Sequence, residues 1–261
     1  MSTGGGSDER RARLRELIRG QGFVSIPDLR SALDVSESTI RRDLDYLVGE
    51  GEVQRTHGGV FFTGGAASLR LFEDRRAGHW AGKRQIALAA SELIEDHDTV
   101  LLDGGSTTYE LARQLIGRPL QVVTNSLPVA NLFSSSEQVD LVVLGGYVHS
   151  RTGVTLGPYA NEMLASLNVQ KAVLSIAGAD RGGYYNSNLL LVETERAMMQ
   201  SADQTIVVAD SSKFGKSSLA KLCPLNAVQT LVCDAELSDE WRRHLSEAQV
   251  NLVLAAAHES A

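Results

Sequence analysis

Hydroxyl, acidic and arginine side chains occupy one short segment near the N-terminus, and their spacing suits DNA recognition. Ile40, Leu44 and Leu47 follow a helical period, so they predict a helix that Ser36 caps and that runs to about residue 49. Polar residues lie at the N-terminus of this helix and wholly or partly on its outer face. They are Ser36, Glu37, Ser38, Thr39, Arg41 and Arg42. Arginine at such a position can bond guanine O6 and N7 in the major groove, and hydroxyl groups can bond phosphate. The alternative is a solvated helix face, because acidic residues lie beside the arginines.

The elements that would position this helix are those of a winged helix-turn-helix. A first helix over about 8–19 precedes a second helix, capped by Ser25, and a short turn separates the second from the third. Two β-like runs then flank the segment Thr56-His57-Gly58-Gly59, which is typical of a hairpin turn. Arg55 and His57 lie on this hairpin, where a wing would contact the DNA backbone or minor groove. His57 could instead serve only as a turn residue with positive φ.

The remainder of the chain alternates short apolar runs with helical stretches. Near-continuous apolar runs are typical of parallel strands covered on both faces. The runs are 99–102, 120–123, 141–144, 172–176, 205–208, 230–232 and 252–254. We therefore expect an α/β fold in which a winged helix-turn-helix precedes a doubly wound, Rossmann-like parallel sheet. The expected division is a disordered tail over 1–7, a DNA-binding domain over 8–63, a linker over 64–71 and an effector-sensing domain over 72–261.

Polar and glycine residues follow five of these strands. They would all meet at the carboxyl edge of the sheet, where open α/β domains bind their ligands. Strand by strand, they are Asp103, Gly104, Gly105, Ser106 and Thr107; Thr124 and Asn125; Gly145 and Gly146; Gly178 and Asp180; and Asp210 and Lys213. One such loop would be an ordinary turn, but five at the same edge indicate a binding site.

The chemistry of this set suits a phosphorylated polyol. The two glycines after the first strand let the backbone approach an anion, which Ser106 and Thr107 would hold at a helix N-terminus. Lys213 supplies a positive charge for phosphate, and the aspartates and Asn125 can bind hydroxyl groups. A plain helix cap and a solvated lysine are the alternatives. The chain lacks G-x-x-x-x-G-K-[ST], and no G-x-G-x-x-G follows the first strand, so a sugar phosphate is favoured over a nucleotide.

Over residues 8–62 the chain resembles the DNA-binding domain of the DeoR family of bacterial transcriptional regulators. The resemblance rests on Ser-Glu-Ser-Thr-Ile-Arg-Arg-Asp-Leu at 36–44 and on Arg-Thr-His-Gly-Gly at 55–59. It implies a sequence-specific regulator that binds double-stranded operator DNA, and a repressor of a carbohydrate-metabolism operon.

Residues from about Phe72 to Leu254 resemble the sensor domain of the same family. Ala209–Gly215 is the most specific stretch, and the loop Asp103–Thr108 also matches. The family's sensor is similar in fold to ribose-5-phosphate isomerase and glucosamine-6-phosphate deaminase, and it binds phosphorylated sugars as effectors. The loop Gly182–Asn188 departs from the family pattern, and Glu193 beyond it completes the expected effector-binding set.

The alternative function is a sugar-phosphate isomerase-like enzyme fused to a DNA-binding domain. Aldose–ketose isomerisation needs a carboxylate base beside the sugar carbon, which Asp180 or Glu193 could provide. Yet Ala177-Gly178-Ala179-Asp180 resembles the isomerase Asp-Gly-Ala-Asp loop with its first aspartate replaced by Ala177. We therefore expect a regulator with no catalytic residues and no cofactor.

Composition and charge exclude several other classes of protein. The 261 residues are 43% hydrophobic and 22% charged, as in a globular chain of one or two domains. The longest apolar runs, such as 250–257, are too short for a membrane span, and the N-terminus has no apolar signal segment. The six histidines and two cysteines show no ligand spacing, so we expect no metal. We expect a cytoplasmic protein with no membrane partner.

The charge is distributed unevenly between the two parts. The net charge of −7 argues against non-specific coating of nucleic acid, but residues 1–63 contain nine arginines and no lysine. Such a set suits bidentate contacts to phosphate or guanine, although codon usage could produce it too. One small DNA-binding domain contacts too little DNA for tight specific binding, so we expect a homo-oligomer, a dimer or a tetramer. The operator, the particular sugar phosphate and the direction of its effect are left open.

Overall fold

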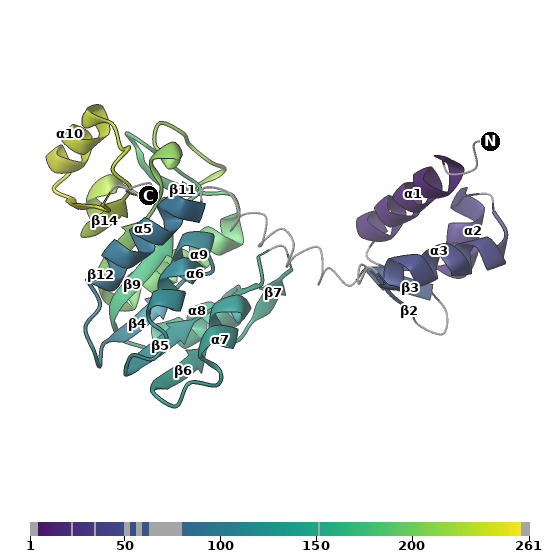
Figure 1. Ribbon diagram of the computed structural model, residues 1–261, viewed down its shortest axis with the longest axis horizontal. Coiled ribbons are helices and arrows are strands. Elements are labelled where there is room, and N and C mark those ends of the chain that lie inside the picture. The colour runs from purple at the N-terminus through teal and green to yellow at the C-terminus, as the bar shows by residue number, and fades with distance from the viewer. Residues whose placement is uncertain are drawn as a thin grey trace, which may run out of the picture. The chain divides into compact units, whose positions relative to one another are not determined.

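The computed structural model describes residues 5–21, 23–33, 35–49, 53–55, 59–62, 80–150 and 152–256 of the chain (Figure 1). Contacts divide the chain into two compact units, Met1–Leu71 and Phe72–Ala261. The expected linker over 64–71 lies outside the described residues.

The N-terminal unit is a helical core closed by a small antiparallel sheet. Its helices are α1 (Gly5–Gln21), α2 (Ile26–Leu33) and α3 (Glu37–Gly49), and its strands are β1 (Phe23–Ser25), β2 (Val53–Arg55) and β3 (Gly59–Phe62). The sheet has the order β1-β3-β2, with both pairs antiparallel. The three helices and the hairpin of a winged helix-turn-helix are therefore present. Strand β1 was not predicted, because three residues are too few to show a strand period.

Local sequence explains where the helices of this unit begin. The Ser25 side chain accepts a hydrogen bond from the Asp28 N–H at 3.2 Å, and Ser36 accepts one from Thr39 at 3.3 Å, as N-caps do. Helix α1 begins at Gly5, so residues 5–7 of the segment expected to be disordered are helical.

The core of the N-terminal unit lies between the three helices. The described residues of this unit with no exposed surface are Leu14, Ile18, Leu29, Ile40, Leu44 and Leu47 of the helices and Val60 of β3. The predicted inner face of α3 is thus confirmed, and the opposite face of that helix is exposed.

The second unit is built on a seven-stranded parallel sheet. Its strands are β4 (Thr99–Leu102), β5 (Leu120–Thr124), β6 (Val139–Val143), β9 (Val169–Ser175), β12 (Ala202–Val208), β14 (Thr230–Cys233) and β15 (Asn251–Leu254). They lie in the order β15-β14-β12-β9-β4-β5-β6, and every adjacent pair is parallel. Strands β4, β5 and β6 therefore follow one another to one edge of the sheet. Strand β9 then lies on the other side of β4, and β12, β14 and β15 follow it to the opposite edge. All seven predicted strands are confirmed.

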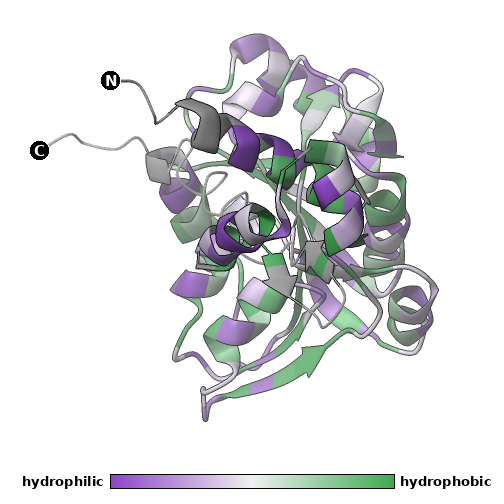
Figure 2. Cartoon of the chain, turned by 90° about the vertical axis from the view of Figure 1, so that its right-hand side faces the viewer, coloured by the Kyte–Doolittle hydropathy of each residue, from purple (hydrophilic) through white to green (hydrophobic). Residues whose placement is uncertain are grey.

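Helices cover both faces of this sheet, so the doubly wound prediction is confirmed (Figure 1). One face packs against α5 (Trp80–Ser91), α6 (Ser106–Gln114) and α7 (Leu127–Phe133), and the other against α8 (Pro158–Ala165), α9 (Leu189–Gln200) and α10 (Asp239–Glu247). Along β4 the side chains alternate, with Val100 and Leu102 in one core and Leu101 in the other. The helices carry apolar and polar stretches in alternation (Figure 2), as helices with one buried face do.

Smaller elements lie outside the seven-stranded sheet. They are the hairpin β7 (Tyr147–His149) and β8 (Val154–Leu156), the antiparallel sheet of β10 (Gly178–Asp180), β11 (Gly183–Asn186) and β13 (Ala220–Cys223), and the 3-10 turns η1 (Ser211–Lys213) and η2 (Leu225–Ala227). Helix α5 ends at Ser91, and Ile94 beyond it is buried. Of the described helices, none combines the length and apolarity that a membrane crossing requires.

Candidate functional site

A cavity of about 350 Å³ lies where strands β4 and β9 run side by side, at their carboxyl ends. This is the point where the strand order reverses, which is the usual ligand position in a doubly wound sheet. The turn between β4 and α6, the end of β9, the start of α9 and the segment after β12 all contribute residues to its lining. The sheet topology, rather than one motif, therefore creates the cavity.

Asp103 ties the two central strands together beneath the cavity. Its carboxylate accepts hydrogen bonds from Gly105 N–H at 2.9 Å, from Ser175 N–H at 2.7 Å and from Ser175 Oγ at 2.9 Å, and also from the Thr108 hydroxyl. Burial raises the pKa of Asp103, and these donors oppose the rise by stabilising the ionised form. Asp103 therefore connects the end of β4 to β9 and to the N-terminus of α6 through hydrogen bonds.

The two glycines of the β4–α6 turn leave room for a ligand and for neighbouring strands. A Cβ atom at Gly104 would overlap the Val154 side chain, and one at Gly105 would overlap Ser175 Oγ. Gly105 is the N-cap of α6 and makes no side-chain cap, while Ser106 and Thr107 in the first turn line the cavity. The positive end of a nine-residue helix thus faces the cavity, which favours an anion there.

Cationic and acidic groups from other elements complete the lining. Lys83 of α5 and Lys213 of η1 are the lysines among the lining residues, and Lys83 is only 6% exposed. Asp210 is 4% exposed and accepts a hydrogen bond from Ser212. Two ammonium groups and a helix N-terminus in one cavity can hold a phosphate, since each contributes positive charge or N–H donors.

A second buried carboxyl group lines the same cavity. Glu195 of α9 is 1% exposed and accepts a hydrogen bond from Asn186 Nδ2 at 2.6 Å. Burial raises the pKa of Glu195 well above its usual value, the nearby Asp103 adds to the rise, and the Asn186 bond opposes it. Asn186 also donates to the Ser175 backbone carbonyl at 3.2 Å, so Glu195 and Asp103 belong to one hydrogen-bond network.

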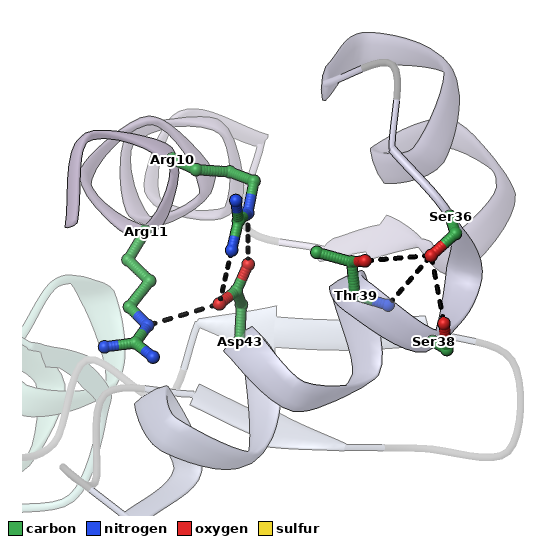
Figure 3. A network of polar contacts seen from close by, with 6 residues as sticks. All are labelled: Arg10, Arg11, Ser36, Ser38, Thr39 and Asp43. Carbon is green, nitrogen blue, oxygen red and sulfur yellow. Dashed lines mark hydrogen bonds and ion pairs between the residues drawn. The ribbon is translucent and has the colours of Figure 1, made fainter. Parts of the chain in front are cut away.

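The outer face of α3 presents the second candidate surface. Arg41 donates to Glu37 Oε1 at 2.6 Å across one turn, and both side chains are about half exposed. Arg42 is exposed beside them. Figure 3 shows the Ser36 hydroxyl at the start of the helix, within 2.9 Å of Ser38 Oγ and 2.8 Å of Thr39 Oγ1. This arrangement gathers guanidinium and hydroxyl groups at a helix N-terminus, where they can reach bases and phosphates.

Asp43 has a different position from its neighbours on α3. It is 2% exposed and points toward α1, where Arg10 Nε donates to it at 2.6 Å and Arg11 Nε at 3.2 Å (Figure 3). Burial alone would raise the pKa of Asp43, but the two arginine hydrogen bonds outweigh burial and hold it below its usual value. Asp43 therefore fixes α3 against α1, and the arginines beside it on α3 remain on the surface.

Family models match both units of the chain. The model described as the DeoR C terminal sensor domain matches residues 79–235, and the DeoR-like helix-turn-helix domain matches residues 10–63. The chain therefore belongs to the DeoR family of transcriptional regulators.

Relatives in this family support the assignment over nearly the whole length. The chain is 33% identical to the HTH-type transcriptional regulator IolR of Bacillus subtilis, over 93% of this chain and 97% of that protein. It is 31% identical to the L-fucose operon activator of Haemophilus influenzae, over 91% and 96% respectively. It is 30% identical to the glycerol-3-phosphate regulon repressor of Escherichia coli, over 92% and 95%. These DeoR-type relatives are named as regulators of transcription, not as enzymes.

Half of the residues expected to bind the effector line the cavity. They are Asp103, Gly104, Gly105, Ser106, Thr107, Asp210 and Lys213. On the DNA-binding side, the structure places Ser36, Glu37, Ser38, Thr39, Arg41 and Arg42 together on or beside the start of α3. His57 and the side chain of Arg55 lie outside the described residues.

The other residues expected at the effector site are not among the residues that line this cavity. Thr124 donates its hydroxyl to the Leu102 carbonyl at 2.7 Å, and Asn125 Nδ2 donates to the Thr155 carbonyl at 3.0 Å. Asp180 accepts from the Gly182 N–H at 2.7 Å in the β10–β11 turn. Thr124 and Asn125 thus hold the end of β5 to neighbouring segments, whereas the Asp180 bond is internal to its own turn.

Three glycines and Glu193 are likewise absent from the lining. Gly145 and Gly146 precede β7, and Gly146 adopts a φ of 139° with no room for a side chain against Leu156. Gly178 lies in β10, where a Cβ would overlap the Lys216 carbonyl. Glu193 lines a separate cavity of about 510 Å³ between α8 and α9, because it lies on a different face of α9 from Glu195.

Several lining residues were not singled out from the sequence. They include Lys83, Thr152, Ser175, Asn186, Ser187 and Glu195. Ser175 ends β9, so the rule applied to the other strand ends could have found it. Asn186 and Ser187 lie in the loop that departs from the family pattern. Lys83 and Glu195 come from helices, and no local motif marks them.

Proposed function

We propose that this DeoR-family regulator binds a phosphorylated sugar in the cavity between β4 and β9 and changes its binding to operator DNA in response. The proposal rests on one observation: two lysines, a helix N-terminus and buried polar groups line the same cavity. The positive groups suit a phosphate, and the acidic and amide groups suit hydroxyls. The name of the glycerol-3-phosphate regulon repressor agrees with a phosphorylated effector.

On the DNA-binding side, we propose that the outer face of α3 contacts operator bases. Arg41 and Arg42 reach bases or phosphates, Ser36, Ser38 and Thr39 contact phosphates, and Glu37 orients Arg41. Arg55 and His57 belong to the wing that would contact the adjacent backbone. Repression of a carbohydrate operon is the proposed outcome, and a protein that acts on operator DNA would work in the cytoplasm.

A homo-oligomer is also part of the proposal. The hairpin of β7 and β8 and the start of α8 expose Tyr147, Val148 and Tyr159, with 65%, 44% and 76% of their surface accessible. Exposed aromatic groups of this size are typical of protein interfaces. Light scattering should give a multiple of the monomer mass, and replacement of Tyr147 and Tyr159 by glutamate should reduce it.

Thermal-shift measurements against a panel of sugar phosphates test the sensing function. A ligand present at 100 times its Kd should stabilise the protein by about 2.7 kcal/mol. The matching unphosphorylated sugars serve as controls, because they lack the anion that the cavity would bind. The same incubations, analysed for interconversion of aldose and ketose phosphates, test the enzyme alternative. Absence of any phosphate-dependent stabilisation would contradict the proposed function.

A further inference from the structure

The two carboxyl oxygens of Glu195 differ in their contacts with the described part of the chain. Its Oε1 accepts the 2.6 Å bond from Asn186, whereas Oε2 is buried and has no hydrogen-bond partner among the residues that the structure describes. Leaving a buried polar atom unpaired is unfavourable, so an unpaired atom of this kind in a native protein calls for an explanation such as a ligand. The side chain belongs to the lining of the cavity between β4 and β9.

The surroundings of Glu195 identify which part of a ligand it would bind. A phosphate already has more suitable partners in Lys83, Lys213 and the N-terminus of α6. An ionised carboxylate repels a phosphate, whereas a hydroxyl can donate to a carboxylate or accept from a carboxylic acid. Of the two polar parts of a sugar phosphate, the hydroxyl groups therefore suit Oε2 in either protonation state.

We propose that Glu195 is a specificity-determining residue that hydrogen-bonds a hydroxyl of the effector, with Asn186 holding its carboxyl group in place. The inference rests on the proposed sugar-phosphate binding. It assigns to Glu195 the selection of a polyol phosphate over inorganic phosphate. It also assigns this role to Glu195 in place of Glu193, which lies at the other cavity.

Replacement of Glu195 by leucine and by glutamine tests the assignment. Leucine removes the polar atoms at similar volume, whereas glutamine keeps a hydrogen-bonding group at the same position. The matched control is Glu193→Leu, two residues away on an exposed part of the same helix. Calorimetry of the full chain would measure the affinity for glycerol 3-phosphate, ribose 5-phosphate and glucose 6-phosphate. Inorganic phosphate serves as the control ligand, because it has no sugar hydroxyl groups.

For the tightest of the three sugar phosphates, Glu195→Leu should weaken binding about tenfold or more, which corresponds to one lost hydrogen bond of about 1.4 kcal/mol. Inorganic phosphate should bind as it does to the wild type. Glu195→Gln should recover most of the lost affinity, and Glu193→Leu should leave all affinities unchanged.

Two results would overturn the assignment and leave sugar-phosphate sensing intact. One is unchanged sugar-phosphate affinity in Glu195→Leu. The other is an equal loss for the sugar phosphate and for inorganic phosphate, since this would show a general disturbance of the cavity. If the wild type binds none of the three sugar phosphates, both the proposed function and this inference are wrong.

Discussion

Arg41 and Glu37 form an ion pair on the exposed face of α3, the face that we propose contacts DNA. Both Nε and Nη2 of Arg41 donate to the same carboxylate oxygen, at 2.9 and 2.6 Å. An exposed pair of this kind contributes little to stability, about 0.3–0.5 kcal/mol. The pair instead fixes the position of the Arg41 guanidinium, which it holds near the helix N-terminus.

Arg41→Ala should weaken binding to the selected operator by about 1–3 kcal/mol and relax specificity at one base pair if Arg41 contacts guanine. A phosphate contact would instead lower the salt slope by about one unit for every DNA sequence. Fluorescence anisotropy at several salt concentrations, with DNA obtained by in vitro selection, separates the two outcomes.

Arg243→Ala is the control for this measurement, because Arg243 is an exposed arginine of α10 in the other unit. It should leave both the affinity and the salt slope unchanged. Unaltered operator binding in both Arg41→Ala and Arg42→Ala would show that α3 does not read the DNA.

Gly105 is required at the β4–α6 turn because Ser175 occupies the space beside it. Gly105→Ala should destabilise the second unit by about 1–3 kcal/mol, since the new Cβ would displace the hydroxyl that bonds Asp103. Chemical denaturation measures the loss. Gly82→Ala in α5 is the matched control, because beyond its chain neighbours and its own helix backbone no atom of the described residues lies within 4 Å of its Cβ position. That change should stabilise the helix by about 0.5–1 kcal/mol, and equal effects of both substitutions would contradict the packing argument.

At the scale of elements, the contact between α1 and α3 depends on the buried carboxylate of Asp43. Asp43→Asn should destabilise the N-terminal unit by about 1–3 kcal/mol, because it leaves Arg10 and Arg11 without their anionic partner. Hydrogen exchange of α1 and α3 in the full chain would detect the loss. Glu16→Gln, an exposed change on α1, should have no such effect.

The same contact makes the stability of the N-terminal unit depend on pH. The pKa of Asp43 in the folded protein lies below its ordinary value, which is about 3.9. The stabilisation is therefore fully present above about pH 4 and is lost as the pH falls through the lower pKa of the folded state. Wild-type α1 and α3 should lose protection in this acidic range. Asp43→Asn should show a smaller change, and identical pH profiles would rule out Asp43 as the cause.

At the scale of the whole molecule, sensing and DNA binding are assigned to separate compact units. Lys213→Ala should therefore weaken sugar-phosphate binding about 10–150-fold, which corresponds to a charged hydrogen bond of about 1.5–3 kcal/mol. Operator affinity without effector should remain close to that of the wild type, and the response to effector should shift to higher concentration. Operator binding measured with and without the sugar phosphate gives both quantities.

Lys216→Ala is the matched control, because Lys216 is exposed three residues away and does not line the cavity. A Lys213→Ala protein that responds at the wild-type effector concentration would show that Lys213 is a solvated lysine. Loss of DNA binding in the absence of effector would instead show that the two units are coupled more tightly than their separate cores indicate.

Sequence alone predicted the fold because its signals are local and repeated. Seven apolar runs separated by helices specify a doubly wound sheet, and Ser25 and Ser36 mark helix starts through bonds to residues three positions away. The helical period of Ile40, Leu44 and Leu47 likewise determined which face of α3 is buried. Strand ends also identified the loops that hold Asp103 and Lys213.

Only the tertiary structure decided which polar residues share the cavity. Asp103 meets Ser175 across 72 positions because β4 and β9 are adjacent at the reversal of strand order, and no local pattern encodes that pairing. Val192, Glu195 and Met198 recur at a helical period on the inner face of α9, so Glu195 is turned inward while Glu193 is turned outward. A charged residue on a buried face has no distinct signal in sequence, since its burial depends on partners that the rest of the fold supplies.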